Sequence, residues 1–520
     1  MRVRIFALAV ATVAMTASAH AQQAMDDHLG TVHFPTSCSA VQGKFDRAVA
    51  LLHNFFYPET LKAFQAVITE DPSCAIAYWG LAMSELPNPL VPPYPPANLK
   101  AGSEAIQQGN AARTQTLREA EYLAAIEVFY RDYDKVDHKT RAEHYEQAMQ
   151  LLHEHHPEDA EAAIFYALAL NGAVDFNDKS YTKQLKAAAI LNEEAKKQPN
   201  HPGIAHYLIH SYDFAPLAAM CVPTAQLYRK IAPGAPHALH MPSHIYSILG
   251  MWDESIRSNL AAKTAAEAYG FSVAHQVDFL VYAYLQRMED GPAKALIDSM
   301  LPISVGLGTD TALAAIPARF ALERGQWNEA AGLSVRASQY PAAQSISYFA
   351  RALGAARSGD AVAARAEIAH LGEIEAKLAS GKDEYWAEQS RIQKQAATAW
   401  VMFAEGRHDE AIDAMRRAAD LDDASEKNVA MENKLVPIRA LLGELYLAAG
   451  KGTEALAEFE AVDKVMPNRF RIVAGAAKAA RESGSVDAAK RYYQALMVLV
   501  AGGDGDRPEI AEARLYLTQN

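Results

Sequence analysis

Hydrophobic and polar positions along this chain are spaced as in helices. Alanine-rich amphipathic stretches such as 362–370 and 476–481 favour α-helix, because alanine has the highest intrinsic helix propensity. No long run alternates Val, Ile or Thr with polar residues, as a half-buried strand would. The sequence therefore predicts an all-α fold.

A period of 34 residues runs through the C-terminal part of the chain. Three positions recur at this spacing: Gly450, Ala455 and Phe459 are followed by Gly484, Ala489 and Tyr493. Together with Gly443, Tyr446 and Pro467, the first set occupies offsets 8, 11, 15, 20, 24 and 32 of one unit. This segment resembles the tetratricopeptide repeat, in which small residues let two helices approach and an aromatic residue packs against the next unit.

The same register recurs upstream, with Pro72, Pro157 and Pro199 at offset 32. It predicts a continuous solenoid of about 11–12 helix pairs over residues 41–500, coiled as a right-handed superhelix. Residues 22–40 precede this array as a lead-in, and residues 501–520 form a linker and a capping helix. Six prolines between 87 and 96 predict an extended loop, and residues 171–180 predict a second long loop.

The N-terminus has the pattern of a cleavable export signal. Arg2 and Arg4 precede an apolar run over 5–14 and a small-residue stretch that ends at Ala21. We expect cleavage near Ala21, removal of residues 1–21, and a periplasmic or secreted mature protein. No later segment approaches the roughly 20 apolar residues that a membrane helix needs, so no membrane span is predicted.

The chain carries a formal net charge of −13, and loss of Arg2 and Arg4 makes it −13 − 2 = −15. Nucleic-acid binding depends on Lys and Arg side chains that neutralise phosphates, so this charge argues against a nucleic-acid partner. A cationic or neutral ligand is easier to accommodate.

Cys38 and Cys74 flank the first predicted helix pair. An antiparallel pair brings its two ends together, so we expect a Cys38–Cys74 disulfide in an oxidising compartment. The alternative is two reduced, half-buried thiols. The third cysteine, Cys221, is expected to be a buried small apolar residue.

Two histidine pairs repeat with the 34-residue period. The unit that begins at Pro202 and the unit that begins at Pro236 contribute the candidate residues His206, His210, Asp213, His237, His240 and His244. The resemblance implies that offsets 2, 5, 9 and 12 line a concave groove and that equal offsets of stacked units are neighbours. Five imidazoles and one carboxylate should then converge, a set suited to a transition metal such as Zn or Cu.

Pro242 complicates this geometry, because proline inside a helix removes a hydrogen bond. If a helix begins at Pro242 instead, His237 and His240 move to the preceding loop, and only His206 and His210 keep the spacing of one helix face. His275 and Asp278 follow one unit later, where the register slips.

No standard catalytic motif is present, which argues against a conventional enzyme. The residue after His206 is not the glutamate of a zinc-protease helix, and there is no phosphate loop, Gly-x-Ser-x-Gly or Cys-x-x-Cys. The whole chain resembles exported bacterial tetratricopeptide-repeat proteins with a similar His-rich segment over 236–244. The resemblance implies a scaffold that binds a protein or peptide in its groove, and a metal-binding protein remains the alternative.

Overall fold

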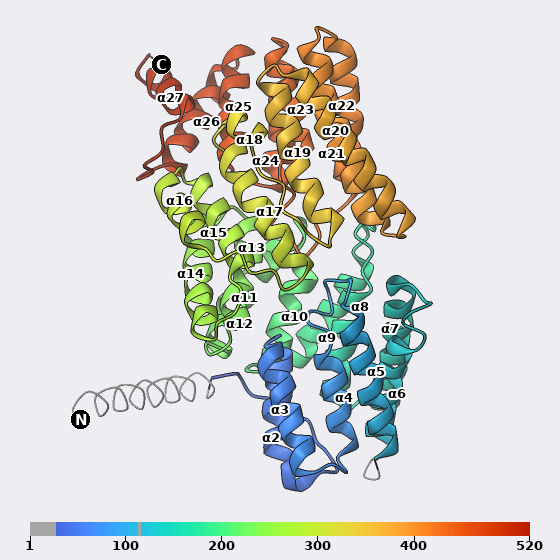
Figure 1. The fold of residues 1–520 in the computed structure, drawn as a ribbon. Coiled ribbons are helices and arrows are strands. Elements are labelled where there is room, and N and C mark those ends of the chain that lie inside the picture. The colour runs from blue at the N-terminus through green and yellow to red at the C-terminus, as the bar shows by residue number, and fades with distance from the viewer. Residues whose placement is uncertain (1–27, 113–115, 520) are drawn as a thin grey trace, which may run out of the picture. The chain divides into compact units, whose positions relative to one another are not determined.

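The computed structural model describes residues 28–112 and 116–519. These residues form helices joined by loops and contain no strand, so the predicted all-α fold is confirmed (Figure 1). The predicted signal over 1–21 lies outside the described residues. Within them, no helix has both the length and the apolarity required to cross a bilayer.

The chain is divided into two compact units. Unit 1 comprises the described part of Met1–Val174 together with Thr182–Tyr212 and Cys221–Pro242, and unit 2 comprises Asp175–Tyr181, Asp213–Met220 and the described part of Ser243–Asn520. The array that the sequence predicts over 41–500 is therefore shared between two units. Each is built from stacked antiparallel helix pairs.

Unit 1 contains the helices α2 to α12, in which consecutive helices pack together. Their bounds are α2 Gln42–His53, α3 Tyr57–Glu70, α4 Ala75–Ser84, α5 Pro96–Ala111, α6 Leu117–Tyr130, α7 His138–His155, α8 Ala160–Gly172, α9 Thr182–Lys197, α10 Pro202–Tyr212, α11 Val222–Ile231 and α12 Pro236–His240. The proline-rich loop joins α4 to α5. Helix α10 packs against both α8 and α2, so the end of this unit returns to its beginning.

Unit 2 contains the remaining helices. Their bounds are α13 Pro242–Ile248, α14 Trp252–Ala268, α15 Ala274–Gln286, α16 Asp290–Ser299, α17 Leu307–Leu322, α18 Trp327–Ala331, α19 Pro341–Arg357, α20 Ala361–Ser380, α21 Glu384–Ala404, α22 His408–Ala424, α23 Ile438–Ala448, α24 Gly452–Val465, α25 Phe470–Glu482, α26 Val486–Leu499 and α27 Pro508–Gln519. The first helices of successive pairs, α15, α17, α19 and α21, pack side by side.

Unit 2 also closes on itself. Helix α25 contacts α15, and the Trp252 indole N–H donates to the carbonyl of Asn468 at 2.6 Å. Near the C-terminus, the Arg507 guanidinium donates to the carbonyl of Leu285 at 3.1 Å. The last helix pairs of this unit therefore pack against its first ones, and the array is not an open superhelix.

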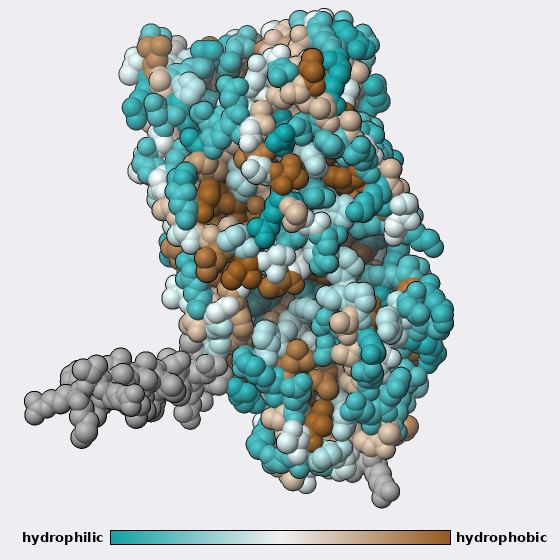
Figure 2. Space-filling view, viewed as in Figure 1, coloured by the Kyte–Doolittle hydropathy of each residue, from teal (hydrophilic) through white to brown (hydrophobic). Residues whose placement is uncertain are grey.

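Close approach between helices depends on small residues, as the repeat pattern requires. A Cβ on Gly80 of α4 would overlap the ring of Phe64 on α3. The same relation holds near the C-terminus, where a Cβ on Gly443 would lie 3.0 Å from the ring of Phe459. The outer face shown in Figure 2 is mainly hydrophilic, with hydrophobic side chains in separate patches.

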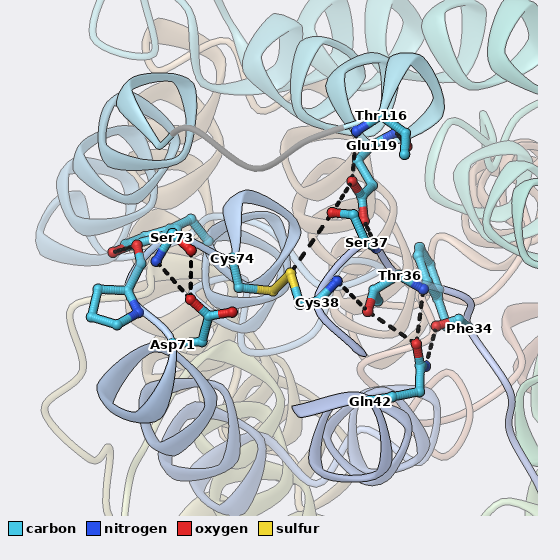
Figure 3. Close-up of a disulfide and its surroundings, with 12 residues drawn as sticks. Phe34, Thr36, Ser37, Cys38, Gln42, Asp71, Ser73, Cys74, Thr116 and Glu119 are labelled. Carbon is cyan, nitrogen blue, oxygen red and sulfur yellow. Dashed lines mark hydrogen bonds between the residues drawn. A yellow bond between two sulfur atoms is a disulfide. The ribbon is translucent and has the colours of Figure 1, made fainter. Parts of the chain in front are cut away.

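A disulfide joins Cys38 to Cys74, with the two Cα atoms 5.6 Å apart (Figure 3). It connects the lead-in before α2 to the residue before α4. The neighbouring Ser37 hydroxyl and amide donate to the Glu119 carboxylate of α6 at 2.8 and 2.7 Å. The lead-in is therefore fixed both covalently and by a carboxylate. Cys221 is buried and is not part of a disulfide.

Three charged side chains meet inside unit 2: Asp278 of α15, Arg319 of α17 and Glu432 of the loop after α22. Arg319 Nε donates to Asp278 Oδ1 at 2.9 Å, and its Nη2 lies 3.5 Å from Glu432 Oε2. Burial raises the pKa of the Glu432 carboxyl to about 7, although the charge of Arg319 opposes this shift. Burial likewise raises the pKa of Asp278.

The helix contact at Gly80 gives a first prediction. Gly80→Ala should lower the free energy of unfolding by about 2 kcal/mol, because the methyl group has no space against Phe64. Gly43→Ala is the matched control, since Gly43 is exposed on α2 and no atom lies within 4 Å of its Cβ position, and it should raise stability by about 0.5 kcal/mol. Urea unfolding followed by circular dichroism measures both. Equal effects of the two substitutions would contradict this account.

The disulfide gives a second prediction. The Cys38→Ser/Cys74→Ser variant should lose about 3 to 4 kcal/mol of unfolding free energy, because a closed loop of 36 residues restricts the unfolded chain. Unfolding should be compared with and without a reductant. Reduction should weaken the wild type and leave the double variant unchanged; an equal response of both proteins would show that the bond does not stabilise the fold.

The third prediction concerns pH. Because the pKa of Glu432 is raised from 4.5 to about 7, the folded state loses stability as pH rises through this interval. The neutral variant Glu432→Gln should therefore match wild type at pH 4.5 and exceed it by about 3 kcal/mol above pH 8. Thermal unfolding across pH provides the measurement. Glu373→Gln changes an exposed side chain and is the control. A gain in stability of Glu432→Gln that is the same at every pH would refute the raised pKa of Glu432.

Candidate metal centre

Three of the five predicted histidines converge in unit 1. His206 and His210 lie one turn apart on α10, and His237 lies on the short helix α12. The Nε2 atom of His206 is 3.0 Å from Nε2 of His210 and 3.0 Å from Nε2 of His237. One ring nitrogen from each imidazole therefore points at a common centre, and all three lie within 4.8 Å of one another.

The other nitrogen of His206 determines its tautomer. His206 Nδ1 lies 2.7 Å from the backbone carbonyl of His53, which can only accept. In a neutral imidazole the proton is then on Nδ1, and Nε2 carries the lone pair. A hydrogen bond from the second nitrogen to a carbonyl is the arrangement that orients histidine ligands of metals.

Two ring nitrogens of this cluster approach the same nitrogen of His206. The single Nε2 lone pair of His206 faces two other Nε2 atoms at equal distance, and one lone pair accepts one well-formed hydrogen bond. A metal ion accepts a lone pair from each ring instead. Zn–N bonds of about 2.0 to 2.1 Å place tetrahedral ligand nitrogens about 3.3 Å apart, and two of the three Nε2 pairs here are 3.0 Å apart.

Aromatic side chains enclose the three imidazoles. The Phe55 ring has centroid distances of 4.4, 5.9 and 5.4 Å to His206, His210 and His237, and Tyr228 stacks on His206 at 5.4 Å. Phe55 has a φ of +50°, which is uncommon for a bulky residue and costs conformational energy. The fold retains this strain at the position where Phe55 covers the cluster. His206 is fully buried, and His210 is 6% exposed.

The remaining predicted residues lie elsewhere. His240 is buried on α12, with its ring centroid 6.0 Å from that of His237. Asp213 and His244 belong to unit 2, where Asp213 Oδ2 lies 2.9 Å from His244 Nδ1 and 2.9 Å from Lys427 Nζ. His275 stands beside His244 in the same unit, with ring centroids 5.8 Å apart.

The repeat register predicts that His206 and His240 are neighbours, because both stand at offset 5. The structure brings His237, at offset 2, to within 3.0 Å of His206. His237 and His240 both lie on α12, so their positions relative to His206 depend on how this short helix packs. The segment is one short helix followed by another, with α13 beginning at Pro242.

A second buried group, His53, Glu161 and His201, was not found from the sequence. His53 Nε2 and His201 Nε2 lie 2.9 and 3.0 Å from the two oxygens of Glu161, and all three residues are at most 2% exposed. Burial acts to raise the pKa of the Glu161 carboxyl, but His201 and His53 outweigh it and hold this pKa below its usual range. Burial lowers the pKa of His53 despite the neighbouring carboxylate.

Most polar side-chain atoms of this second group are hydrogen-bonded to one another or to Tyr207, whereas His201 Nδ1 has no hydrogen-bond partner among the described residues. Each Glu161 oxygen accepts from one imidazole, and the remaining His53 nitrogen pairs with the Tyr207 hydroxyl at 2.9 Å. Its function is therefore support: it fixes His53, whose carbonyl orients His206. The sequence shows His53 on the first helix but gives no sign of its distance from the cluster, because 153 residues separate it from His206.

Comparison with known proteins adds little. No family model matches this chain, and no curated protein matches it. Among solved structures, a chain from "Structure of Naa15/Naa10 bound to HypK-THB" is similar, with 13% identity over 92% of this chain and 80% of that chain and a TM-score of 0.25. A similarity of this size carries no functional argument, so the functional reasoning depends on the site itself.

Proposed function

We propose that this helical-repeat protein binds a transition-metal ion through His206, His210 and His237. The observation that carries the proposal is the convergence of three Nε2 atoms, one of them oriented by a backbone carbonyl. Imidazole nitrogens suit Zn, Cu, Ni or Fe rather than Ca or Mg. The net charge of −13 also favours a cationic ligand.

A three-nitrogen set leaves one position of a tetrahedral ion for water or another small ligand. Structural zinc sites usually supply four protein ligands, whereas sites with three histidines keep an exchangeable position. The dry aromatic surroundings of Phe55 and Tyr228 limit competition from bulk water. Binding of an exchangeable ligand is therefore part of the proposal, and no particular reaction is assigned.

Export to an oxidising compartment is a further part of the proposal. The N-terminal pattern of Arg2, Arg4 and a short apolar run supports it. The Cys38–Cys74 disulfide is consistent with it, because such bonds persist in the periplasm and outside the cell. The mature chain would then begin near Gln22.

Binding of a protein or peptide is the second candidate function. Stacked helix pairs form extended surfaces on which other repeat proteins bind partners. In unit 2, the observation that favours it is a buried irregular segment lying across α17 and α21. This candidate involves other residues than the histidine cluster, and the two functions are compatible.

The fourth prediction tests metal binding. Mature, untagged protein purified without a chelator should contain about one equivalent of transition metal by elemental analysis, and His206→Ala/His237→Ala should contain none. Wild-type apoprotein should gain about 3 kcal/mol in stability when free Zn²⁺ is 100 times Kd. Circular dichroism must show unchanged helix content in the variant; if it does not fold, His210→Ala alone provides the comparison.

Two control variants distinguish the His206 cluster from the Glu161 group as the metal site. His370→Ala changes an exposed imidazole and should keep the full metal content. His201→Asn changes the hydrogen-bonded group at Glu161 and leaves the bond from Glu161 to His53 in place, so it should also keep the metal in protein that remains folded. Metal-free wild type with no thermal shift in Zn²⁺ or Cu²⁺ would overturn the proposal, and loss of metal in His201→Asn alone would transfer the site to the second group.

A further inference from the structure

Unit 2 contains a pair of histidines that the site proposed above does not use. His244 lies on α13, and His275 lies near the start of α15. One ring nitrogen of each lies within 4.8 Å of the other, and the ring centroids are 5.8 Å apart. Phe279, one turn later on α15, packs against both rings at centroid distances of 4.8 and 5.2 Å. The two imidazoles are therefore held next to each other by an aromatic side chain of their own unit.

The separation of this pair along the chain recurs at other contacts. His206 and His237 are 31 residues apart, and so are Asp213 and His244. His244 and His275 are again 275 − 244 = 31 residues apart. In a repeat array, equal steps along the chain carry a side chain to an equivalent place on the next repeat. The neighbouring positions of His244 and His275 therefore follow from the packing of the repeats.

Asp213 fixes the orientation of His244. The Oδ2 atom of Asp213 lies 2.9 Å from His244 Nδ1 and accepts from Lys427 Nζ at 2.9 Å. All three side chains are at most 9% exposed. Because an ionised carboxylate can only accept, a neutral His244 carries its proton on Nδ1 and its lone pair on Nε2.

The charges around His244 favour its neutral form. Lys427 already compensates the carboxylate of Asp213. A protonated His244 would place a second cation at the same buried oxygen, and a buried charge without a partner of its own is costly. A neutral imidazole whose Nδ1–H is bonded to a carboxylate is the arrangement that orients histidine ligands of metal ions and raises their basicity.

The donor atoms indicate the class of ion. Imidazole nitrogens suit Zn, Cu or Ni, whereas Ca and Mg prefer oxygen ligands. His275 is partly exposed and His244 is buried, so an ion can enter from the side of His275. Water or another small ligand completes the coordination of this ion.

We propose that His244 and His275 of unit 2 bind a second transition-metal ion, and that Asp213 is the positioning residue for His244. This site is independent of the proposed function, because it uses none of His206, His210 and His237. Two protein ligands hold an ion more weakly than three, so the second ion is lost during purification and returns when metal is added. The metal content of the protein as purified therefore stays near one equivalent.

The test uses the full mature protein with His206→Ala/His237→Ala, which removes the ligands of the first site. Isothermal titration calorimetry with Zn²⁺ should show one bound equivalent in this background. Addition of His244→Ala should abolish this binding. Addition of Asp213→Asn instead should weaken it about ten-fold or more, because residues that orient a histidine ligand typically contribute about 10- to 100-fold to metal affinity.

His408→Ala changes an exposed imidazole of unit 2 and should leave the titration unchanged. Circular dichroism must show native helix content in each protein. If the variant with His244→Ala does not fold, His275→Ala takes its place, and if the background does not fold, His210→Ala replaces it. Absence of Zn²⁺ binding in the folded background would rule out the second site and leave Asp213 and His244 as a structural pair. Binding that survives both His244→Ala and His275→Ala would rule it out as well.

Discussion

The structure depends on one constraint: each helix buries its apolar stripe only by packing against the next helix. Small residues set how closely the helices approach, as at Gly80 against Phe64 and Gly443 against Phe459. Because the contacts are between neighbours, the array grows by adding pairs, and its curvature is the sum of small rotations. Here that curvature brings α10 back to α2 in unit 1 and α25 back to α15 in unit 2.

Because the later helices of each unit return to its first ones, the interior of each unit is enclosed. An open solenoid exposes its concave side to water, whereas a closed one must fill it with groups that satisfy one another. Unit 1 fills it with imidazoles, a carboxylate and aromatic rings around His53 and His206. Unit 2 fills it with buried charges and an irregular segment of its own chain. Both interiors are polar and largely shielded from solvent, an environment in which ligand binding and pKa shifts are strong.

The buried groups around Glu161 and around His206 differ in their hydrogen bonds. This difference distinguishes a supporting group from a candidate metal site. Around Glu161, two imidazole donors meet two carboxylate oxygens, so both oxygens are paired. Around His206, the Nε2 atoms of His210 and His237 both lie 3.0 Å from the same Nε2 atom. The group around Glu161 holds the group around His206 in place through the backbone carbonyl of His53.

The sequence by itself determined the helices, their 34-residue period and the single helix face that carries His206 and His210, because helix periodicity and small-residue spacing are local properties. Only the tertiary structure decided that His237 meets His206, because this contact depends on how α10, α11 and α12 pack together. The positions of Glu161 and of the buried loop 425–437 could not be predicted from the sequence either. They depend on how each unit closes on itself, and this closure is the sum of small rotations over many repeats, so no single repeat encodes it.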